Sequence, residues 1–408
     1  MNKKHILIIT SVYPRNPTDR YGCFIQEFIK QLQASDTGNT KFTVFAPAYK
    51  GLTNHFDEGI KVYRFRYCLK QFEILTHGEG AGTEATRAPT KVQKNPGYIL
   101  LAAFYIISGS WQLFWLCLKL KPDLINTHWP FPHGLMAWPT SKFLNIPLVF
   151  SCHGAELMLG KKFGFVTKTL RFLFSEAKGI TANSSFTKNL IQAVRNCPVT
   201  VIPYGLTIET KPAKEHSPEQ LPTILCVGNM YERKGMKYLI DALPIVLEKH
   251  AVKLRIIGKG EQEQSLKNQV KVLGIEQEVE FLGFVSNEVL SSEYASCDIF
   301  VLPSIIDRQG DTEGQGIPVV EALAHGKPVV ASAVGGIVDA IESGKTGLLV
   351  PEKDPQALAD ALISLLNNPK AAREMGRLGQ QDIHKRYSWD RLGQLWQDVY
   401  QKALLSAN

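Results

Sequence analysis

The chain has 408 residues, a length that favours two domains over one, and its 44% apolar and 21% charged residues are ordinary for a globular protein. The formal charge of +8 is uneven, because residues 1–205 carry 24 Lys and Arg against 11 Asp and Glu, whereas residues 206–408 carry 22 against 27. The basic half favours an anionic surface such as phospholipid headgroups, and the scattered cations resemble neither a recognition helix nor a stacking platform, so no nucleic-acid partner is expected.

Seven cysteines are widely spaced and form no Cys-x-x-Cys pair. This spacing argues against a zinc site or a disulfide framework and favours a reducing compartment. The N-terminus, residues 1–10, has a charged start followed by an apolar run of only about five residues, which is short for a signal peptide and reads as a first buried strand.

Short apolar runs alternate with helical stretches along both halves of the chain. This alternation predicts parallel sheets covered by helices, and its repetition predicts an α/β protein with two doubly wound domains. We place the domains at 1–206 and 223–388, joined by a polar linker at 207–222. Two such domains bind ligands at strand carboxyl ends, so a site is expected in a cleft between them. The predicted strands are 6–10, 43–46, 124–127, 148–151, 179–182, 224–227, 254–257, 280–282, 299–302 and 328–331.

The segment from Tyr98 to Cys117 contains no charged residue. Three interpretations remain open: a buried or half-buried helix, an interfacial helix that contacts a bilayer, and a transmembrane span. Ser108-Gly-Ser110 and Gln112 interrupt the apolar run, and a span would separate strands of one sheet. Residues 76–97 lack core-forming side chains and are expected to form a long mobile loop, which is either a surface insertion or a contact for an acceptor or membrane.

Residues 313–321 read Glu-Gly-Gln-Gly-Ile-Pro-Val-Val-Glu, two carboxylates eight positions apart around a predicted helix start. Pro318 suits the first helical turn, and Glu321 is expected near that turn. The amides of Gly314, Gln315, Gly316 and Ile317 would attract an anion, while the carboxylates Glu313 and Glu321 can accept hydrogen bonds from sugar hydroxyls. A nucleotide sugar, with its ribose, diphosphate and hexose, has the matching layout.

Arg233 and Lys234 follow the strand predicted at 224–227 and precede a helix. Adjacent Arg and Lys supply a bidentate fork and a point charge for a diphosphate, and they would stabilise the negative charge that develops as a sugar leaves. As an isolated motif, the pair could equally be a solvated helix start.

These motifs together resemble retaining glycosyltransferases of family four, which have the GT-B fold of two Rossmann-like domains facing a cleft. The resemblance covers nearly the whole chain and rests on the order and spacing of several motifs. In the first half they are Asp123-Leu-Ile-Asn-Thr-His128, Ser151-Cys-His-Gly-Ala-Glu156, Thr181-Ala-Asn-Ser184 and Val201-Ile-Pro-Tyr-Gly205. In the second half they are Val227-Gly-Asn-Met-Tyr-Glu-Arg-Lys-Gly235, Cys297-Asp-Ile-Phe-Val-Leu-Pro-Ser304 and Glu313–Glu321.

The resemblance implies roles for individual residues. His153 would lie against the donor sugar, Gly22 would approach the phosphates, Glu313 would face the hexose and Glu321 the ribose. The last helix, 389–405, would return to the first domain. The sequence departs from the family at Asn229, where many relatives have Arg, at Glu156, where Asp is usual, and at Gly22, the single glycine of a loop that often has two. Asp307, Arg308 and Asp311 are weaker candidates, and Gly258-Lys-Gly260 is interpreted as a turn.

No Asp-x-Asp pair or His/Cys cluster is evident, so neither a metal nor a cofactor is expected. The resemblance implies retention, and without an obvious nucleophile front-face substitution is preferred. We expect transfer of a hexose from a nucleotide sugar to a lipid-linked glycan, for the synthesis of cell-surface polysaccharide, by a cytoplasmic protein peripheral to the membrane. The rivals are a GT-B epimerase or hydrolase and a non-catalytic scaffold subunit.

Overall fold

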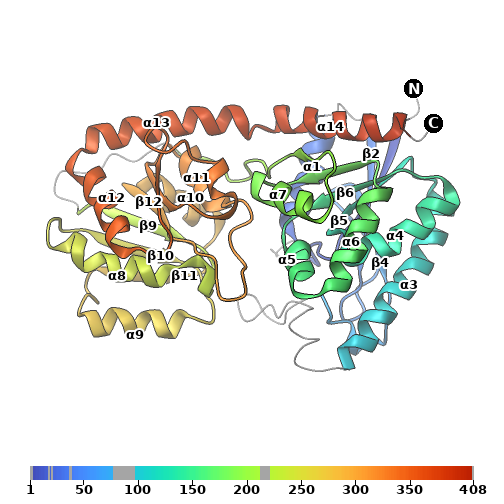
Figure 1. The fold of residues 1–408 in the computed structure, drawn as a ribbon, viewed down its shortest axis with the longest axis horizontal. Coiled ribbons are helices and arrows are strands. Elements are labelled where there is room, and N and C mark those ends of the chain that lie inside the picture. Colours follow the sequence, from blue (N-terminus) through green and yellow to red (C-terminus); the bar gives the residue numbers. More distant parts are fainter. Residues whose placement is uncertain are drawn as a thin grey trace. The chain divides into compact units, whose positions relative to one another are not determined.

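The computed structural model describes residues 3–16, 19, 22–35, 39–76, 97–211 and 221–406. The chain forms two compact units, the first extending to Tyr204 and including the last helix, the second running from Gly205 to Ser388 (Figure 1). The loop expected at 76–97 falls almost entirely outside the described residues, as does most of the linker expected at 207–222. The described residues on either side of that linker belong to the second unit.

The first unit is built on an eight-stranded sheet with the order β3-β4-β2-β1-β5-β6-β7-β8. All neighbouring pairs are parallel except the hairpin of β3 and β4. The strands are β1 (Lys4–Ile9), β2 (Thr40–Pro47), β3 (His55–Asp57), β4 (Ile60–Phe65), β5 (Leu124–His128), β6 (Leu148–Cys152), β7 (Gly179–Ala182) and β8 (Thr200–Val201).

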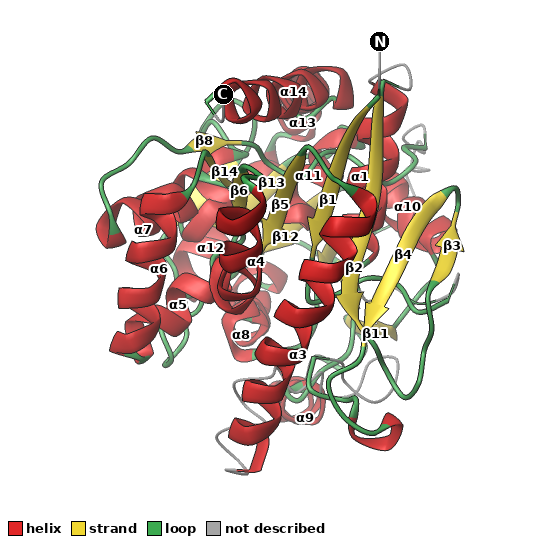
Figure 2. Cartoon of the chain, turned by 90° about the vertical axis from the view of Figure 1, so that its right-hand side faces the viewer, coloured by secondary structure: helices red, strands yellow, loops and turns green. Residues whose placement is uncertain are grey.

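Helices cover both faces of this sheet, as continuous apolar strands require. On one face α3, α4 and α6 lie side by side (Figure 2). On the other face α1 packs against β2 and α14, and α14 packs against β5, β6 and β7. The helices are α1 (Cys23–Ser35), η1 (Lys70–Phe72), α3 (Gly97–Leu120), α4 (Pro130–Leu144), α5 (Ala155–Lys162), α6 (Gly164–Glu176), α7 (Ser185–Val194) and α14 (Trp389–Leu405). The last helix buries Leu392, Trp396 and Tyr400 in the first unit.

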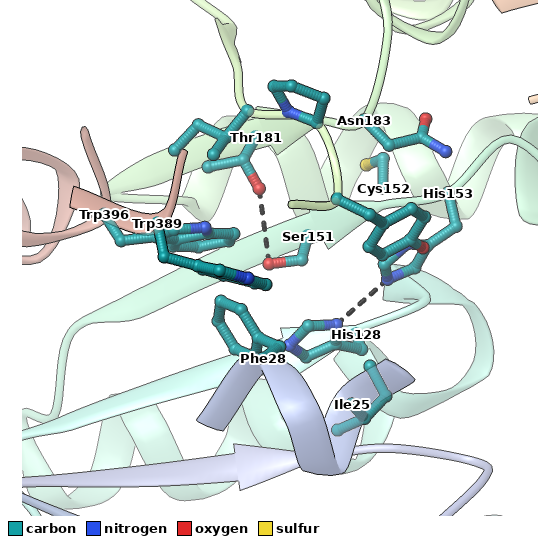
Figure 3. A pocket seen from close by; sticks show the side chains of 13 residues that line it. Ile25, Phe28, His128, Ser151, Cys152, His153, Thr181, Asn183, Trp389 and Trp396 are labelled. Carbon is teal, nitrogen blue, oxygen red and sulfur yellow. Dashed lines mark hydrogen bonds between the residues drawn. The ribbon is translucent and has the colours of Figure 1, made fainter. Parts of the chain in front are cut away.

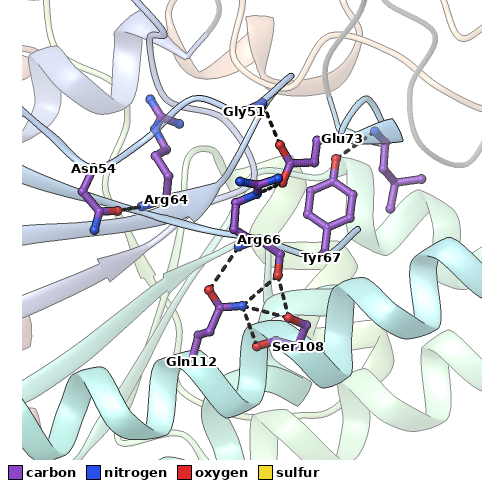
Figure 4. Close-up of polar contacts among 9 residues, drawn as sticks. Gly51, Asn54, Arg64, Arg66, Tyr67, Glu73, Ser108 and Gln112 are labelled. Carbon is purple, nitrogen blue, oxygen red and sulfur yellow. Dashed lines mark hydrogen bonds and ion pairs between the residues drawn. The ribbon is translucent and has the colours of Figure 1, made fainter. Parts of the chain in front are cut away.

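Helix α3 contains the long uncharged segment, and it is half-buried. Tyr105, Leu113 and Cys117 lie in the core, whereas its outer face is exposed. Two of the polar residues that interrupt the apolar run have a structural role, because Ser108 Oγ and Gln112 Nε2 donate to the Arg66 carbonyl at 2.5 and 2.7 Å (Figure 4). Among the described residues, α3 is the one helix that is both long enough and apolar enough to cross a membrane. The core helix of a soluble protein can pass the same test.

The second unit has a six-stranded parallel sheet with the order β11-β10-β9-β12-β13-β14. The strands are β9 (Thr223–Val227), β10 (Lys253–Ile257), β11 (Val279–Gly283), β12 (Ile299–Leu302), β13 (Val329–Ser332) and β14 (Leu348–Val350). The helices are η2 (Glu232–Lys234), α8 (Met236–Leu247), α9 (Glu263–Leu273), α10 (Asn287–Ser296), α11 (Ile317–Ala324), η3 (Gly335–Asp339), α12 (Pro355–Asn367) and α13 (Pro369–Arg386). Helices α8, α9 and α12 share one core with the sheet, and α10, α11 and α13 share the other.

All ten predicted strands are present within a few residues of their predicted bounds. The prediction missed the β3–β4 hairpin and the short strands β8 and β14. These segments are brief and only partly buried, so they lack the continuous apolar run that marks a central strand.

Candidate functional site

The loops at the carboxyl ends of β9, β10 and β12 pack backbone to backbone in the second unit. A Cβ at Gly235 would lie 1.9 Å from the Pro303 carbonyl oxygen, and one at Gly258 would lie 2.0 Å from the Gly228 oxygen. The Ile305 amide donates to the Arg233 carbonyl at 2.8 Å, which fixes the loop after β12 against η2. Close glycine contacts therefore bring the loop that carries Arg233 and Lys234 against the loop that leads to Glu313.

Glu313 lies between the two cations that the sequence analysis paired with a diphosphate. Its Oε2 accepts from Lys234 Nζ and, at 3.3 Å, from Arg233 Nη1. The carboxylate of Asp311 is 3.9 Å from Arg233 Nε. Burial raises the pKa of the Glu313 carboxyl, but Lys234 and Arg233 outweigh this effect and hold the pKa below its usual value. Glu313 is therefore ionised at neutral pH, and the three side chains form one buried charge cluster.

Helix α11 begins directly after this cluster. Its N-cap, Gly316, has φ +78° and no side chain with which to cap the helix, and Pro318 lies in the first turn as predicted. A Cβ at Gly335 would lie 2.0 Å from the Glu313 carbonyl oxygen, which accepts from the Gly336 amide at 2.9 Å. The segment 314–317 is therefore held between the cation cluster and the loop after β13.

Glu321 is the fifth residue of α11, directly after the first turn and so near it as predicted, because the helix begins at Ile317. Its carboxyl accepts from the Tyr294 hydroxyl on α10 at 2.8 Å. Burial raises the pKa of Glu321 to about 7, against the lowering effects of Tyr294 and Lys234. Tyr294, which the sequence analysis did not single out, also stacks on His325 with ring centroids 5.2 Å apart.

Several buried polar atoms around this cluster have no hydrogen-bond partner among the described residues. They are Arg233 Nε and the hydroxyls of Ser304, Thr312 and Ser332. Ser304 and Thr312 lie in the loop after β12, and Ser332 ends β13. Buried polar groups are normally satisfied, so a group of unsatisfied ones at adjoining strand ends points to a polar ligand.

The weaker candidates of this loop have local roles. Asp307 Oδ1 accepts from the Gln309 and Asp311 amides at 2.9 Å and so shapes the loop. Arg308 is 92% exposed and lies 3.4 Å from Glu232. Gly258 and Gly260 form the predicted turn, because a Cβ at either position would meet backbone atoms of residues 228–230.

In the first unit, His153 follows β6 and is held by both ring nitrogens. Its Nε2 lies 3.0 Å from His128 Nδ1 (Figure 3), and its Nδ1 is hydrogen-bonded to the Tyr204 hydroxyl. The His153 ring stacks on Tyr204, with 1° between the planes, and on His128, with 14°. The His153 amide donates to Glu156 Oε1 at 2.9 Å.

Burial keeps these imidazoles neutral. It lowers the pKa of His153 to about 3, and burial together with the charges of His153 and His133 lowers the pKa of His128 well below its usual value. If the Tyr204 hydroxyl donates to His153 Nδ1, then His153 donates to His128 Nδ1, and the remaining proton is on His128 Nε2. That buried atom has no partner among the described residues. His153 is thus a fixed, neutral ring.

Gly22 starts α1 in a conformation with φ +85°, and a Cβ there would lie 2.7 Å from the Val12 backbone. Phe24, two residues later, packs edge-on against His153 and Tyr204 with ring centroids 6.2 and 5.1 Å apart. The start of α1 and the end of β6 therefore adjoin, as expected for the carboxyl ends of parallel strands.

A small cavity lies behind the imidazole pair (Figure 3). His128, His153 and Tyr204 line one part of it, and the apolar rings of Phe28, Trp389 and Trp396 line another. Its walls are largely apolar, so it serves to bury the imidazoles more than to bind a sugar.

The structure thus groups Arg233, Lys234 and Glu313 in the second unit, with the start of α11 adjoining, and places Gly22 near His153 in the first. Three residues of these sites were not predicted from the sequence: His128, Tyr204 and Tyr294. His128 and Tyr204 end or adjoin the end of predicted motifs, which was a signal for them, but nothing in the sequence indicated the contacts that they make. Among the described residues, no three His, Cys, Asp or Glu side chains are grouped as a metal site would require.

Comparison with known proteins is informative at this point. Residues 27–210 match the model of Glycosyltransferase Family 4, and residues 207–382 match that of Glycosyl transferases group 1. A phosphatidyl-myo-inositol mannosyltransferase of Mycobacterium leprae is 34% identical over 291 residues, 70% of this chain and 75% of that protein. An uncharacterized glycosyltransferase of Methanocaldococcus jannaschii is 35% identical over 181 residues, 44% of this chain and 45% of that protein, so the match spans less than half of this relative.

Two solved structures share the fold. Sucrose-phosphate synthase from Thermosynechococcus elongatus has a TM-score of 0.76 at 19% identity, covering 100% of both chains. HepE of Anabaena, in complex with UDP and glucose, has a TM-score of 0.67 at 19% identity, covering 98% of this chain and 99% of that one.

The two doubly wound units, each with polar side chains at its strand carboxyl ends, define a protein of the GT-B class. The chain belongs to the family-four glycosyltransferases and is an enzyme of glycosyl transfer.

Proposed function

We propose that the protein is a retaining, metal-independent hexosyltransferase that moves a hexose from a nucleoside-diphosphate sugar to a hydroxyl of a lipid-linked glycan. The observation that carries the proposal is the buried cluster of Arg233, Lys234 and Glu313 beside the uncapped start of α11. Cations, amides at a helix start and carboxylates are the groups that a diphosphate between two sugars requires.

The diphosphate would bind the cations and the first amides of α11. Lys234 Nζ has three donors, of which Glu313 uses one, and Arg233 Nε has no acceptor among the described residues. Charge-assisted bonds at these atoms would strengthen as the sugar–phosphate bond breaks, because negative charge then accumulates on the departing phosphate. This is preferential stabilisation of the transition state, the requirement for catalysis.

The two carboxylates would hold the sugars. Glu313 is ionised and has an oxygen beyond the one that Lys234 and Arg233 contact, so it can accept from hexose hydroxyls. Glu321, with a pKa of about 7, would accept from the ribose while Tyr294 fixes its position. His153, neutral and stacked on Tyr204, would offer a hydrogen-bonding ring nitrogen only by exchanging one of its present partners.

Front-face substitution suits this set of residues. Glu313 is paired with cations and His153 is a weak base, so neither is set up as a covalent nucleophile or general base. The acceptor oxygen would bond to the anomeric carbon on the side from which the diphosphate departs. The bond between the anomeric carbon and the phosphate oxygen would break, and the acceptor proton would pass to the leaving phosphate. Arg233, Lys234 and the α11 amides would neutralise that phosphate without a divalent cation.

A lipid-linked acceptor and a position on the cytoplasmic face of the cell membrane complete the proposal. The excess of cations in residues 1–205 supports it. The Mycobacterium leprae relative is named for a phosphatidylinositol substrate, and a structural neighbour is a lipopolysaccharide galactosyltransferase. Assembly of a cell-surface polysaccharide is the context we propose.

The test begins with calorimetric titration of a panel of nucleoside diphosphates, in the presence of a chelator, against the wild type, Glu313→Gln and, as a control on α9, Lys271→Gln. Donor turnover is then measured with and without lipid extract, and the product's anomeric configuration is read by NMR. We expect nucleotide binding that survives chelation, acceptor-dependent turnover with retention, and a large loss of turnover in Glu313→Gln alone. Rapid turnover without acceptor would instead support a hydrolase or epimerase, and full turnover in Glu313→Gln would support a scaffold. Isolation of a glycosyl–enzyme adduct would refute front-face substitution.

A further inference from the structure

The outer face of α3 is a continuous apolar surface. Its exposed residues follow one another at intervals of three or four, which places them on one side of the helix. We call this set the α3 face: Leu100, Phe104, Ile107, Trp111, Trp115 and Leu118. Phe104, Ile107 and Trp111 are each at least 60% exposed. Isolated exposed apolar residues are ordinary, but a run of six over the length of a helix marks a surface that binds something.

Aromatic contacts extend this surface to the neighbouring helices. Phe143, at the end of α4 and 82% exposed, packs edge-on against Phe114 of α3. Phe172 of α6 packs edge-on against Trp138 of α4 with centroids 5.1 Å apart and is itself exposed. The helices α3, α4 and α6 lie side by side on one face of the sheet (Figure 2). The apolar surface therefore spans three helices.

The stretch of chain that forms α3, α4 and α6 is rich in exposed cations. Residues 97–176 carry seven exposed cations: Lys119, Lys121, Lys142, Lys161, Lys162, Lys168 and Arg171. The same stretch has three acids, and each is engaged: Asp123 accepts from the His5 amide, Glu156 is buried and Glu176 pairs with Lys142. An apolar surface with outward-facing tryptophans, on a stretch of chain with an excess of exposed cations, matches the interface of an anionic bilayer.

The packing of α3 excludes insertion as a span without unfolding. The inner face of the helix buries Tyr105, whose hydroxyl bonds to His133 Nε2 at 3.0 Å, and Gln112 is bonded to the Arg66 backbone. A helix that keeps these contacts can lie only in the plane of the membrane, with its outer side chains reaching about 5–10 Å into the headgroup region. A second copy of the chain is a poorer occupant, because a two-fold interface would place the same cations against one another.

We propose that the α3 face, with Phe143 and Phe172 and the exposed cations of this stretch of chain, docks the enzyme on an anionic phospholipid bilayer. Crossover helices run antiparallel to their strands, so the N-terminal end of α3 lies toward the strand carboxyl ends, the edge that holds His153. Docking here would bring that edge near the membrane surface. The inference rests on the proposed function only for the claim that a lipid-linked acceptor is met at that surface.

The test is co-sedimentation of the full chain with phosphatidylcholine vesicles that contain or lack phosphatidylglycerol. We expect binding that depends on phosphatidylglycerol and weakens with salt, with a blue shift of tryptophan fluorescence. The Ile107→Gln/Trp111→Gln variant should lose at least about tenfold in vesicle affinity, and Lys168→Gln/Arg171→Gln about tenfold on the anionic vesicles only. The matched control is Val272→Gln/Leu273→Gln on α9, also exposed apolar residues, which should bind as the wild type does.

Three outcomes would overturn the proposal: no vesicle binding by the wild type, undiminished binding by the α3 variant, or a dimer in light scattering that this variant dissociates. Nucleoside-diphosphate affinity and thermal unfolding of each variant show whether it is folded. The nucleoside-diphosphate affinity also separates the docking proposal from the proposed glycosyl transfer. Vesicle binding without nucleotide binding would refute the glycosyl-transfer mechanism and leave docking intact, and nucleotide binding without vesicle binding would do the reverse.

Discussion

Replacement of Lys234 by Met removes the charge that holds Glu313 while keeping a side chain of similar length. Lys234 is 6% exposed and donates to Glu313 Oε2, which keeps the 3.3 Å contact to Arg233 in the variant. We expect Lys234→Met to weaken nucleoside-diphosphate binding, because a cation that contacts the phosphates is gone, and to destabilise the fold, because Glu313 loses its nearer partner.

The size of the binding effect follows from the contact that is lost. A hydrogen bond to a charged group contributes about 1.5–3 kcal/mol, and each 1.4 kcal/mol is roughly a factor of ten in Kd, so affinity should fall between about tenfold and about a hundredfold. Leaving one partner of a buried ion pair alone costs up to about 3–5 kcal/mol, and the remaining Arg233 contact places the expected loss of stability at the low end of that range or below it.

The stability difference should also depend on pH. Burial raises the pKa of Glu313, but Lys234 and Arg233 more than offset this effect and hold the pKa below that of an ordinary glutamate. A carboxyl whose pKa is lower in the folded state stabilises the protein at pH values above its pKa in the unfolded state. This stabilisation is lost as the pH falls through the pKa of the folded state. The gap in unfolding free energy between wild type and Lys234→Met should therefore be largest at neutral pH and shrink below pH 4.5.

Calorimetric titration measures the binding effect, and urea unfolding at several pH values measures the stability effect. Lys271→Met, at an exposed position on α9, serves as the control and should leave both unchanged. A Kd within about twofold of the wild type would refute the assignment of Lys234 to the diphosphate. A stability gap that does not shrink in acid would refute the account of Glu313.

Two further predictions concern the second unit. Tyr294→Phe removes a hydrogen bond that lowers the Glu321 pKa, so this pKa should rise above about 7. A carboxyl whose pKa is raised in the folded state contributes stability that is lost as the pH rises from 4.5 through that raised pKa. Urea unfolding should therefore show that the variant loses more unfolding free energy over this pH interval than the wild type does. An unchanged pH profile would contradict this prediction. Gly235→Ala should cost more than about 3 kcal/mol in unfolding free energy, because its Cβ would lie 1.9 Å from the Pro303 oxygen at φ +63°. Gly274→Ala has a similar φ of +67° but open space, so a loss of about 1 kcal/mol is expected there, and equal losses would show that the close approach is unimportant.

The apolar runs were enough to predict both sheets, because a strand covered on both faces must be apolar along its length. They were not enough to predict β3 and β4, where the residues alternate in burial and only pairing with β2 defines the strand. The start of α11 and the place of Glu321 near its first turn followed from Gly316 and Pro318. The hydrogen bond between Glu321 and Tyr294 did not, because it joins two different helices.

The sequence by itself determined that two α/β domains exist and that Arg233, Lys234 and Glu313 belong to one site, because strand ends and the order of motifs are local features of the chain. Only the tertiary structure decided that Glu313 lies between the two cations, that Tyr204 and His128 fix His153, and that one face of α3 is buried while the other is exposed. These are contacts between segments far apart in sequence. They arise when neighbouring strands bring their carboxyl ends together, and neither residue spacing nor composition encodes which side chains then meet.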